Sequence, residues 1–192
     1  LDLAIEEPLV VPIDQHFNVK GIGLVAIGYV QSGSVSVHDD LLLVPADGPG
    51  TVKSLQVMDD DVEKAVAGDR VGIALRNTKE DHLSGGSLII HPAIVDKNKG
   101  ISVPVCLDKH ERSSIDLDTS PFQKRKLLVG DIVHASVDLQ FVVGRVESVD
   151  GVLEVAWESP LFIRRDNPPI VLIAQLDSKP RIMGGARLTR LS

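Results

Sequence analysis

The 192-residue sequence predicts an all-β protein that consists of two small antiparallel β-barrels. Three features support this prediction: apolar residues alternate with other residues in short runs, turn residues separate those runs, and helical spacing is almost absent. Only 3% of the residues are aromatic, so Val, Ile, Leu and Ala must fill the cores. The β-branched members of this set fit the pleated surface of a sheet, which also favours strands.

The alternation is clearest in residues 71–75, 101–107 and 133–139, where every second residue is Val, Ile, Leu or Ala. This period of two is typical of strands with one buried face. Helical spacing is present only in residues 59–67, and this run is too short to predict a helix. Turn signals rich in Gly, Pro, Ser, Asn and Asp separate the runs, in residues 31–33, 46–50, 150–151 and 166–169.

The charge balance changes near His91 and Pro92, which predicts a domain boundary there. Residues 1–91 contain 6 Lys and Arg and 14 Asp and Glu, a net charge of −8. Residues 92–192 contain 14 and 13, a net charge of +1, and the two values add to the −7 of the whole chain. We therefore predict one barrel in residues 1–91 and a second in residues 92–192. Because an acidic chain repels phosphate, nucleic-acid contacts are expected to be local and mainly in the second half.

The composition indicates a cytoplasmic protein without a membrane segment. No run approaches the roughly 20 uninterrupted apolar residues that a membrane helix needs, and residues 1–7 lack the basic start and apolar centre of a signal peptide. Cys106 is the only cysteine, so an internal disulfide is impossible. Proteins of a reducing cytoplasm commonly lack disulfides. The chain begins with Leu1 rather than Met, which we interpret as the start of a processed or excised segment.

The sequence carries no motif for catalysis or metal binding. It has no phosphate-binding loop of the form G-x-x-x-x-G-K-[ST], which a nucleotide triphosphate site of that class requires. Residues 69–72 match a bare D-x-x-G pattern, which we interpret as an Asp that opens a strand. The six histidines lack paired ligand spacing, and Asp59-Asp60-Asp61 lacks the spaced ligands of a calcium loop. We therefore predict no catalytic residue, no metal site and no cofactor in this segment.

The first half resembles domain two of the translational GTPases. The resemblance begins in residues 13–30, which read IDQHFNVKGIGLVAIGYV, and it extends over roughly residues 10–91. The later blocks that carry it are residues 32–35, 39–41, 52–56 and 65–75. The tail is similar to the closing strands of domain three, in residues 169–173 and 181–188. Residues 92–165 match only loosely.

Within this family, the chain looks closest to SelB-like factors, with elongation factor Tu and the gamma subunit of initiation factor two as relatives. Two positions depart from the family pattern. Leu24 stands where the family usually has Thr, and Gly85-Gly86 stands where an Arg-Gly pair often ends the domain. The departures leave the expected fold unchanged and bear on which factor the chain belongs to and which cargo it binds.

The resemblance implies a site for the aminoacylated 3′ end of tRNA on the first barrel, formed by Asp14, His16 and Phe17 with Asp69 and Arg70 across from them. A carboxylate can bind the α-amino group, an aromatic ring can form an apolar wall, and a guanidinium can bind a phosphate. Each residue also has a purely structural interpretation. Phe17 can be a core residue, His16 can be a surface strand residue, and Asp69 can simply open its strand.

The resemblance also implies that domain three contacts the tRNA backbone. The candidate residues in the second half are Arg164, Arg165, Arg181 and Arg187, with Arg190 beside them in the tail. A solvated charged surface is the alternative interpretation for each of them.

These observations predict the barrel domains of a translation elongation factor that acts in protein biosynthesis by RNA binding. The expected partners are aminoacyl-tRNA, the ribosome and a preceding GTP-binding domain of the same protein. GTP and magnesium would bind to that domain, so GTPase activity would belong to the full-length protein and not to this segment. The alternative is a protein-interaction or structural β-barrel that binds no tRNA, and the −8 charge of the first half favours it.

Overall fold

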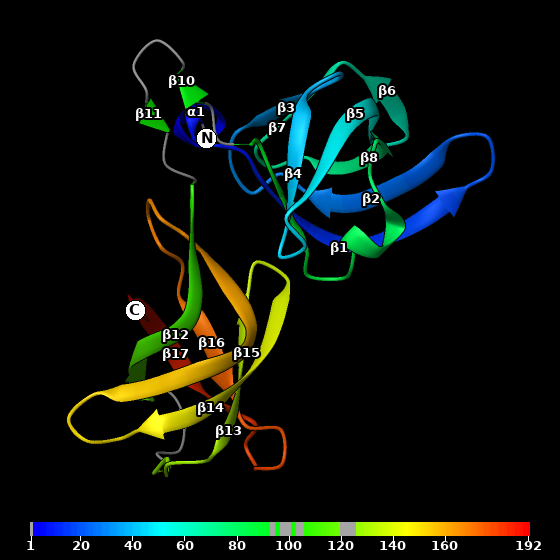
Figure 1. Cartoon of the computed structure of the whole chain (residues 1–192). Helices are drawn as coiled ribbons and strands as arrows, with labels where there is room; N and C mark the ends of the chain where they lie inside the picture. Colours follow the sequence, from blue (N-terminus) through cyan, green and yellow to red (C-terminus); the bar gives the residue numbers. More distant parts are fainter. Residues whose placement is uncertain (1, 93–94, 97–100, 103–105, 120–125) are drawn as a thin grey trace. The chain divides into compact units, whose positions relative to one another are not determined.

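The structure is a computed structural model, and it describes residues 2–92, 95–96, 101–102, 106–119 and 126–192. The chain divides into two compact units, Leu1–Val105 and Cys106–Ser192 (Figure 1). Each unit contains a closed antiparallel barrel of six strands, which confirms the predicted all-β fold. The limits predicted for the two domains, 1–91 and 92–192, place their division between the last strand of the first barrel and the first strand of the second.

In order around the first barrel, the strands are β4 (Asp40–Val44), β9 (Leu88–Ile90), β1 (Val10–Val19), β2 (Gly23–Tyr29), β8 (Arg70–Arg76) and β5 (Gly48–Val57). The barrel closes because β5 pairs both with β8 and with β4, the two strands that end the row of the other five. The short strand β6 (Asp60–Val62) extends the sheet from β5, and β3 (Ser34–Ser36) pairs with β7 (Lys64–Val66). The weak helical spacing of residues 59–67 therefore corresponds to two short strands.

Alternating burial along these strands forms the core of the first barrel. Val71, Ile73 and Leu75 are all buried, as their alternation predicts. The other buried side chains come from every strand around the barrel, and Ala4 and Ile5 of the short helix α1 (Asp2–Glu6) pack against them. A single turn of 3-10 helix, η1 (Glu80–His82), precedes β9.

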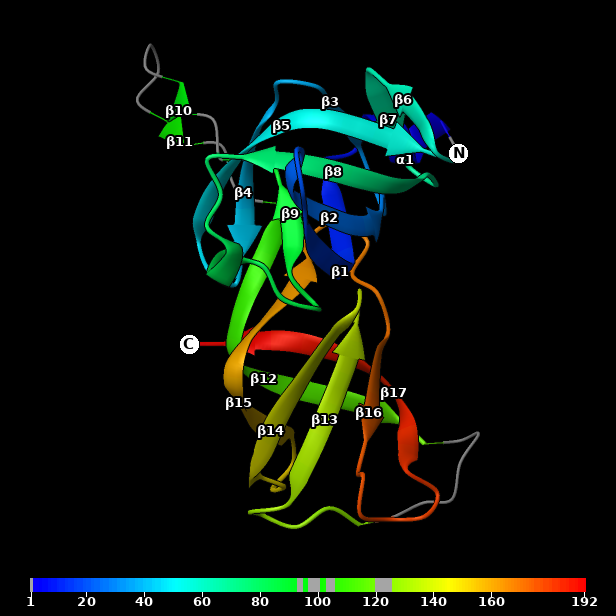
Figure 2. The same cartoon turned by 90° about the vertical axis from the view of Figure 1, so that its right-hand side faces the viewer.

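The second barrel has the strand order β12 (Leu107–Asp118), β15 (Leu153–Arg164), β14 (Gln140–Ser148), β13 (Ile132–Val137), β16 (Val171–Ala174) and β17 (Ile182–Leu191), and β17 pairs back to β12. Figure 2 shows β14, β13 and β16 side by side. Val133, Ala135 and Val137 are buried, which confirms the alternation predicted in residues 133–139, although the strand ends before Leu139.

Two further strands, β10 (Val95–Asp96) and β11 (Ile101–Ser102), form a separate pair between the barrels in the sequence. The run predicted in residues 101–107 is therefore described only at its two ends, because residues 103–105 lie outside the described residues. The predicted turns fall between strands, except that β5 already begins at Gly48. In the described part of the chain, no helix has the length and apolar character that crossing a membrane requires.

Candidate functional site

The predicted site residue Asp14 lies at an irregularity in β1. The register between β1 and β2 shifts between Ile13 and Gln15, so Asp14 is the extra residue of a β-bulge. A bulge bends its strand and changes the direction of a side chain, which is why such features occur next to binding sites. Gly28 permits the close approach of β2 here, since a Cβ atom at that position would collide with the carbonyl oxygen of Pro12.

Asp14 and Arg70 form an ion pair. The Arg70 Nη2 atom donates a hydrogen bond to Asp14 Oδ2 at 3.1 Å, and the two side chains are 61% and 45% exposed respectively. Arg70 opens β8, and β2 lies between β8 and β1. An exposed pair of this kind contributes only about 0–1 kcal/mol to stability, so it can be exchanged for contacts with a ligand at small cost.

Asp69 has a structural role in the turn before β8. Its Oδ2 atom accepts a hydrogen bond of 2.9 Å from the backbone N–H of Val66, and its own N–H bonds to the Val66 carbonyl. The interpretation of Asp69 as the residue that opens a strand therefore describes its place in the fold. Its side chain also borders a surface hollow together with Arg70.

Phe17 and His16 lie on opposite faces of β1, because adjacent residues of a strand alternate. Phe17 pairs with Val25 and is 46% exposed, so it is not a core residue. His16 pairs with the fully buried Ala26 and is half-buried. The structure therefore places Phe17 on the outer face of the barrel and directs His16 away from that face.

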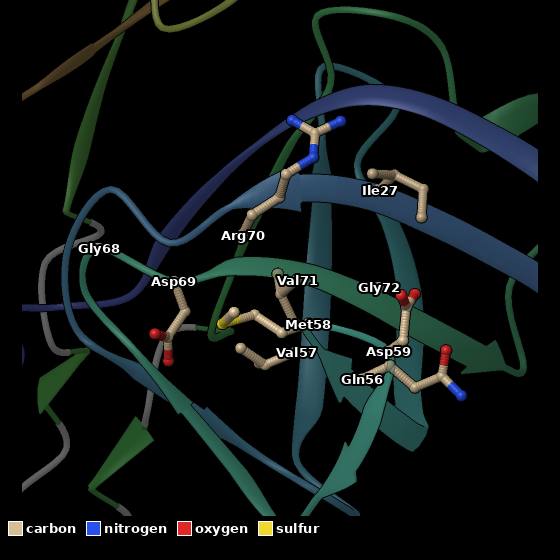
Figure 3. Close-up of a pocket in the computed structure, with 10 residues that line it drawn as sticks. All are labelled: Ile27, Gln56, Val57, Met58, Asp59, Gly68, Asp69, Arg70, Val71 and Gly72. Atoms are coloured by element: carbon tan, nitrogen blue, oxygen red, sulfur yellow. The ribbon is translucent and has the colours of Figure 1, made fainter.

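A hollow of about 370 Å³ lies on the outer surface beside Arg70 (Figure 3). The turn between β5 and β6 forms one wall, through Met58, which is 90% exposed, and Asp59. In Figure 3 the Met58 side chain extends toward Asp69, while the Arg70 guanidinium points away from Met58. The remaining lining residues are Ile27, Gln56, Val57, Gly68, Val71 and Gly72.

The sequence analysis did not identify the Met58 side of this hollow. A signal for it was present, since Val57 and Met58 are two consecutive apolar residues directly before three aspartates. Met58 and Asp59 both have positive φ angles, 51° and 66°, which is the conformation of a tight hairpin turn. That turn brings Met58 to the hollow. Neither the residue spacing nor the polarity of the turn predicts which residues of β8 lie beside Met58.

The arginines predicted for the second barrel fall into two groups. Arg164 is bound to Asp138, with Nε to Oδ2 at 2.9 Å, and Arg165 is bound to Asp108, with Nε to Oδ1 at 3.0 Å. Arg181 and Arg187 are exposed, and no ion pair is recorded for either of them within the described residues. The second group therefore offers the cations that are not already bound to carboxylates.

Residues 23–90 match the family model of elongation factor Tu domain 2. An uncharacterized protein of Methanocaldococcus jannaschii is 34% identical over 140 residues, which cover 73% of this chain and 41% of that protein. The selenocysteine-specific elongation factor of the same organism is 41% identical over 81 residues, covering 42% of this chain and 17% of that factor. Elongation factor 1-alpha of Pyrococcus horikoshii is 24% identical over 189 residues, covering 93% and 42%.

Two solved structures share the fold over nearly the whole chain. The elongation factor SelB of Methanococcus maripaludis, in its apo form, has a TM-score of 0.78 at 24% identity, covering 97% of this chain and 42% of that one. A bacterial selenocysteine-specific elongation factor has a TM-score of 0.77 at 23% identity, covering 98% and 29%. The chain spans less than half the length of each of these relatives.

Proposed function

We propose that this chain holds the aminoacylated 3′ end of a tRNA on its first barrel. The chain fits domains two and three of a translational GTPase, and it is a translation-factor barrel module. The observation that carries the proposal is the exposed Asp14–Arg70 pair beside the hollow. An aminoacylated 3′ end bears an ammonium group and phosphates, so it offers a partner to each member of the pair.

The pair explains how the site can distinguish a charged from an uncharged tRNA. A phosphate that binds Arg70 without a nearby ammonium leaves Asp14 without its cation. When both groups are present, the α-amino group binds Asp14, and each charged side chain exchanges one partner for another. The ester-linked amino acid therefore adds affinity through Asp14, and Phe17 supplies an apolar surface on the same face of the barrel.

The second barrel contributes backbone contacts through arginines that form no ion pair in the described part of the chain. Arg181 and Arg187 are the best candidates because their cations are exposed and no carboxylate is recorded against them within the described residues. Arg164 is only 20% exposed and Asp138 is 6% exposed, so breaking this pair would leave a buried charge. We therefore expect Arg164 to serve stability, whereas the Arg165–Asp108 pair is 41% and 34% exposed and can be exchanged for a phosphate contact.

The remaining partners belong to the whole factor. A preceding domain would bind GTP and magnesium and carry the GTPase activity, and the assembled factor would deliver its cargo to the ribosome in the cytoplasm. This proposal rests on the similarity to elongation factors. Sequencing the gene upstream of Leu1 tests it, since a phosphate-binding loop is expected there.

Filter binding of charged and uncharged tRNA to the full-length, GTP-loaded protein tests the site. Asp14→Asn should weaken binding of charged tRNA by about 1–3 kcal/mol, roughly 5- to 150-fold. It should strengthen binding of uncharged tRNA, because the substitution frees Arg70 for phosphate. Arg70→Gln should weaken both, and Arg76→Gln is the matched control, since Arg76 is an exposed arginine at the other end of β8.

Equal effects of Asp14→Asn on the two RNAs would contradict the proposed role of its carboxylate. Absence of tRNA binding by the full-length wild-type protein would instead favour the alternative function, a β-barrel that binds another protein. The net charge of −8 in residues 1–91 is the observation that supports that alternative.

A further inference from the structure

A second, smaller hollow of about 70 Å³ adjoins the first one on the outer face of the first barrel. Ile27, Gln56 and Gly72 line both hollows, so the two are adjacent. The smaller one contains no ionisable side chain among its lining residues, which are Ile22, Val25, Ile27, Ser54, Gln56, Gly72 and Ala74. Its surface is therefore an uncharged strip in which apolar side chains lie beside the polar groups of Ser54 and Gln56.

The strip is positioned to receive a group attached to a ligand that binds at Arg70. Gly72 lies two residues after Arg70 on β8, so both residues face the same side of the sheet. The strand pairing extends this face sideways, because Gly72 lies opposite Ile27, and Val25 lies opposite both Ala74 and Phe17. A ligand whose phosphate meets Arg70 can thus place its neighbouring group along Ile27 and Val25.

The charges around the two hollows are unfavourable for an anion. Arg70 is the only cation among the lining residues, and Asp14 already neutralises it at 3.1 Å. Asp59 and Asp69 line the larger hollow as carboxylates. Lys53 lies near the strip, but its ammonium group donates a hydrogen bond of 2.8 Å to the carbonyl of Ile22. An anion here would lose part of its hydration and would face the carboxylates of Asp59 and Asp69.

We infer that this site selects tRNAs whose amino acid has a neutral, apolar side chain and discriminates against anionic ones. The inference rests on the proposed function, because it assigns the strip to the side chain of the bound amino acid. It also separates this chain from the cargo named for its structural relatives, since a selenol ionises at neutral pH. The two structural relatives are 23% and 24% identical, and the selenocysteine-specific factor that is 41% identical is matched over only 17% of its own length, so neither comparison transfers the cargo.

Gly72 provides a variant that alters the strip without straining the fold. A Cβ atom at this position would lie 3.5 Å from Ile27 Cδ1 and 4.0 Å from Gln56 Cβ, which are ordinary van der Waals distances. Gly72→Ala therefore adds one methyl group to the floor that both hollows share. Steric loss from this substitution should grow with the size of the bound side chain.

The test uses one tRNA body acylated in turn with glycine, valine, aspartate and selenocysteine, together with the uncharged form. Filter binding to the full-length, GTP-loaded protein should show valyl-tRNA binding about tenfold or more tightly than the aspartyl and selenocysteinyl forms. Gly72→Ala should weaken binding of valyl-tRNA and leave glycyl-tRNA and uncharged tRNA unchanged.

The outcomes separate this inference from the function on which it rests. If every acylated form binds more tightly than uncharged tRNA but with equal affinity, the proposed function stands and the selectivity is wrong. Tighter binding of the aspartyl or selenocysteinyl form would overturn the selectivity in the same way, as would a Gly72→Ala effect of equal size on all five RNAs. If no acylated form binds more tightly than uncharged tRNA, the proposed function fails, and the selectivity fails with it.

Discussion

The two barrels close with the same number of strands but differ in what they bury. The first core is aliphatic, and its buried polar residues are only Ser32 and Ser87 among those the structure describes. The second buries His110, Ser113 and Gln140, and the first two lie beside Trp157, the single Trp of the chain. Barrel closure therefore requires alternating apolar side chains, and it tolerates a polar interior when each buried group finds a hydrogen-bond partner.

The buried polar residues of the second barrel form two separate sets of hydrogen bonds, a network around Ser113 and the contacts of Gln140. Trp157 Nε1 donates to Ser113 Oγ at 2.9 Å, and Ser113 Oγ is 2.7 Å from His110 Nδ1. The indole N–H can only donate, so the Ser113 hydroxyl proton is available for the unprotonated His110 nitrogen. Gln140 bonds to both the N–H and the carbonyl of Phe162. These contacts join β12, β14 and β15.

The two barrels share one local structural motif, a four-residue turn that ends in Asp. In residues 36–39, 66–69 and 128–131, the Asp carboxylate accepts a hydrogen bond of 2.9 Å from the N–H three residues earlier. The third residue of each turn has a positive φ angle, and these residues are His38, Gly68 and Gly130. The same turn therefore precedes strands of both barrels, and it does not depend on which residues those strands expose.

The largest effect is expected from a matched pair of core deletions, Ile73→Ala and Ile173→Ala. Both side chains are fully buried, one in each barrel. Each substitution should destabilise its own barrel by about 2–5 kcal/mol because it leaves a cavity. Hydrogen exchange followed by mass spectrometry reports the two barrels separately. Equal loss of protection in both barrels from either variant would show that they unfold as one unit.

Ser113→Ala tests the polar network of the second barrel. The substitution leaves Trp157 Nε1 and His110 Nδ1 without their common partner, which should cost about 1–3 kcal/mol. The fluorescence of Trp157 reports the transition during urea denaturation. Ser136→Ala is the control, because it removes a hydroxyl from a half-buried position on β13 of the same barrel. Equal destabilisation by the two variants would contradict a special role for the network.

The two barrels should also differ in their response to acid. Burial lowers the pKa of His110 below its ordinary value of 6.5, and the nearby Arg190 lowers the pKa further, while Asp108 opposes the shift. The unfolded chain therefore takes up this proton more readily than the folded one, so stability is full above about pH 6.5 and decreases as the pH falls below it. Stability of the second barrel should decline in this range, measured by urea denaturation across pH. His110→Gln should abolish the dependence, and an unchanged dependence would assign it to other groups.

The smallest effect is expected from the shared turn. Asp69→Ala and Asp131→Ala each remove one side-chain acceptor at a partly exposed turn, so each should cost about 0.5–1.5 kcal/mol. Equal losses measured by thermal denaturation would support one local structural motif in two different barrels. If Asp69→Ala costs much less than Asp131→Ala, the Asp69 carboxylate contributes little to its turn and is free for a ligand.

Local sequence was sufficient for the fold class and for several strands. The alternating burial of residues 71–75 and 133–137 follows from the strand period of two. This pattern can be recognised from a few consecutive residues, without knowledge of the rest of the chain. The resemblance likewise identified domain two, which the family model confirms over residues 23–90. The weak helical spacing of residues 59–67 was uninformative, because a tight hairpin turn and two short strands occupy that segment.

The sequence by itself thus determined that the chain forms barrels, and it supplied the candidate site residues only as a prediction. Only the tertiary structure decided that Asp14 is bound to Arg70, 56 positions away, and that Phe17 is exposed while His16 faces the other way. It also separated the bound Arg164 and Arg165 from the exposed Arg181 and Arg187. The physical reason is that strand periodicity is local, whereas ion pairs and hollows depend on register and bulges between strands that are distant in sequence.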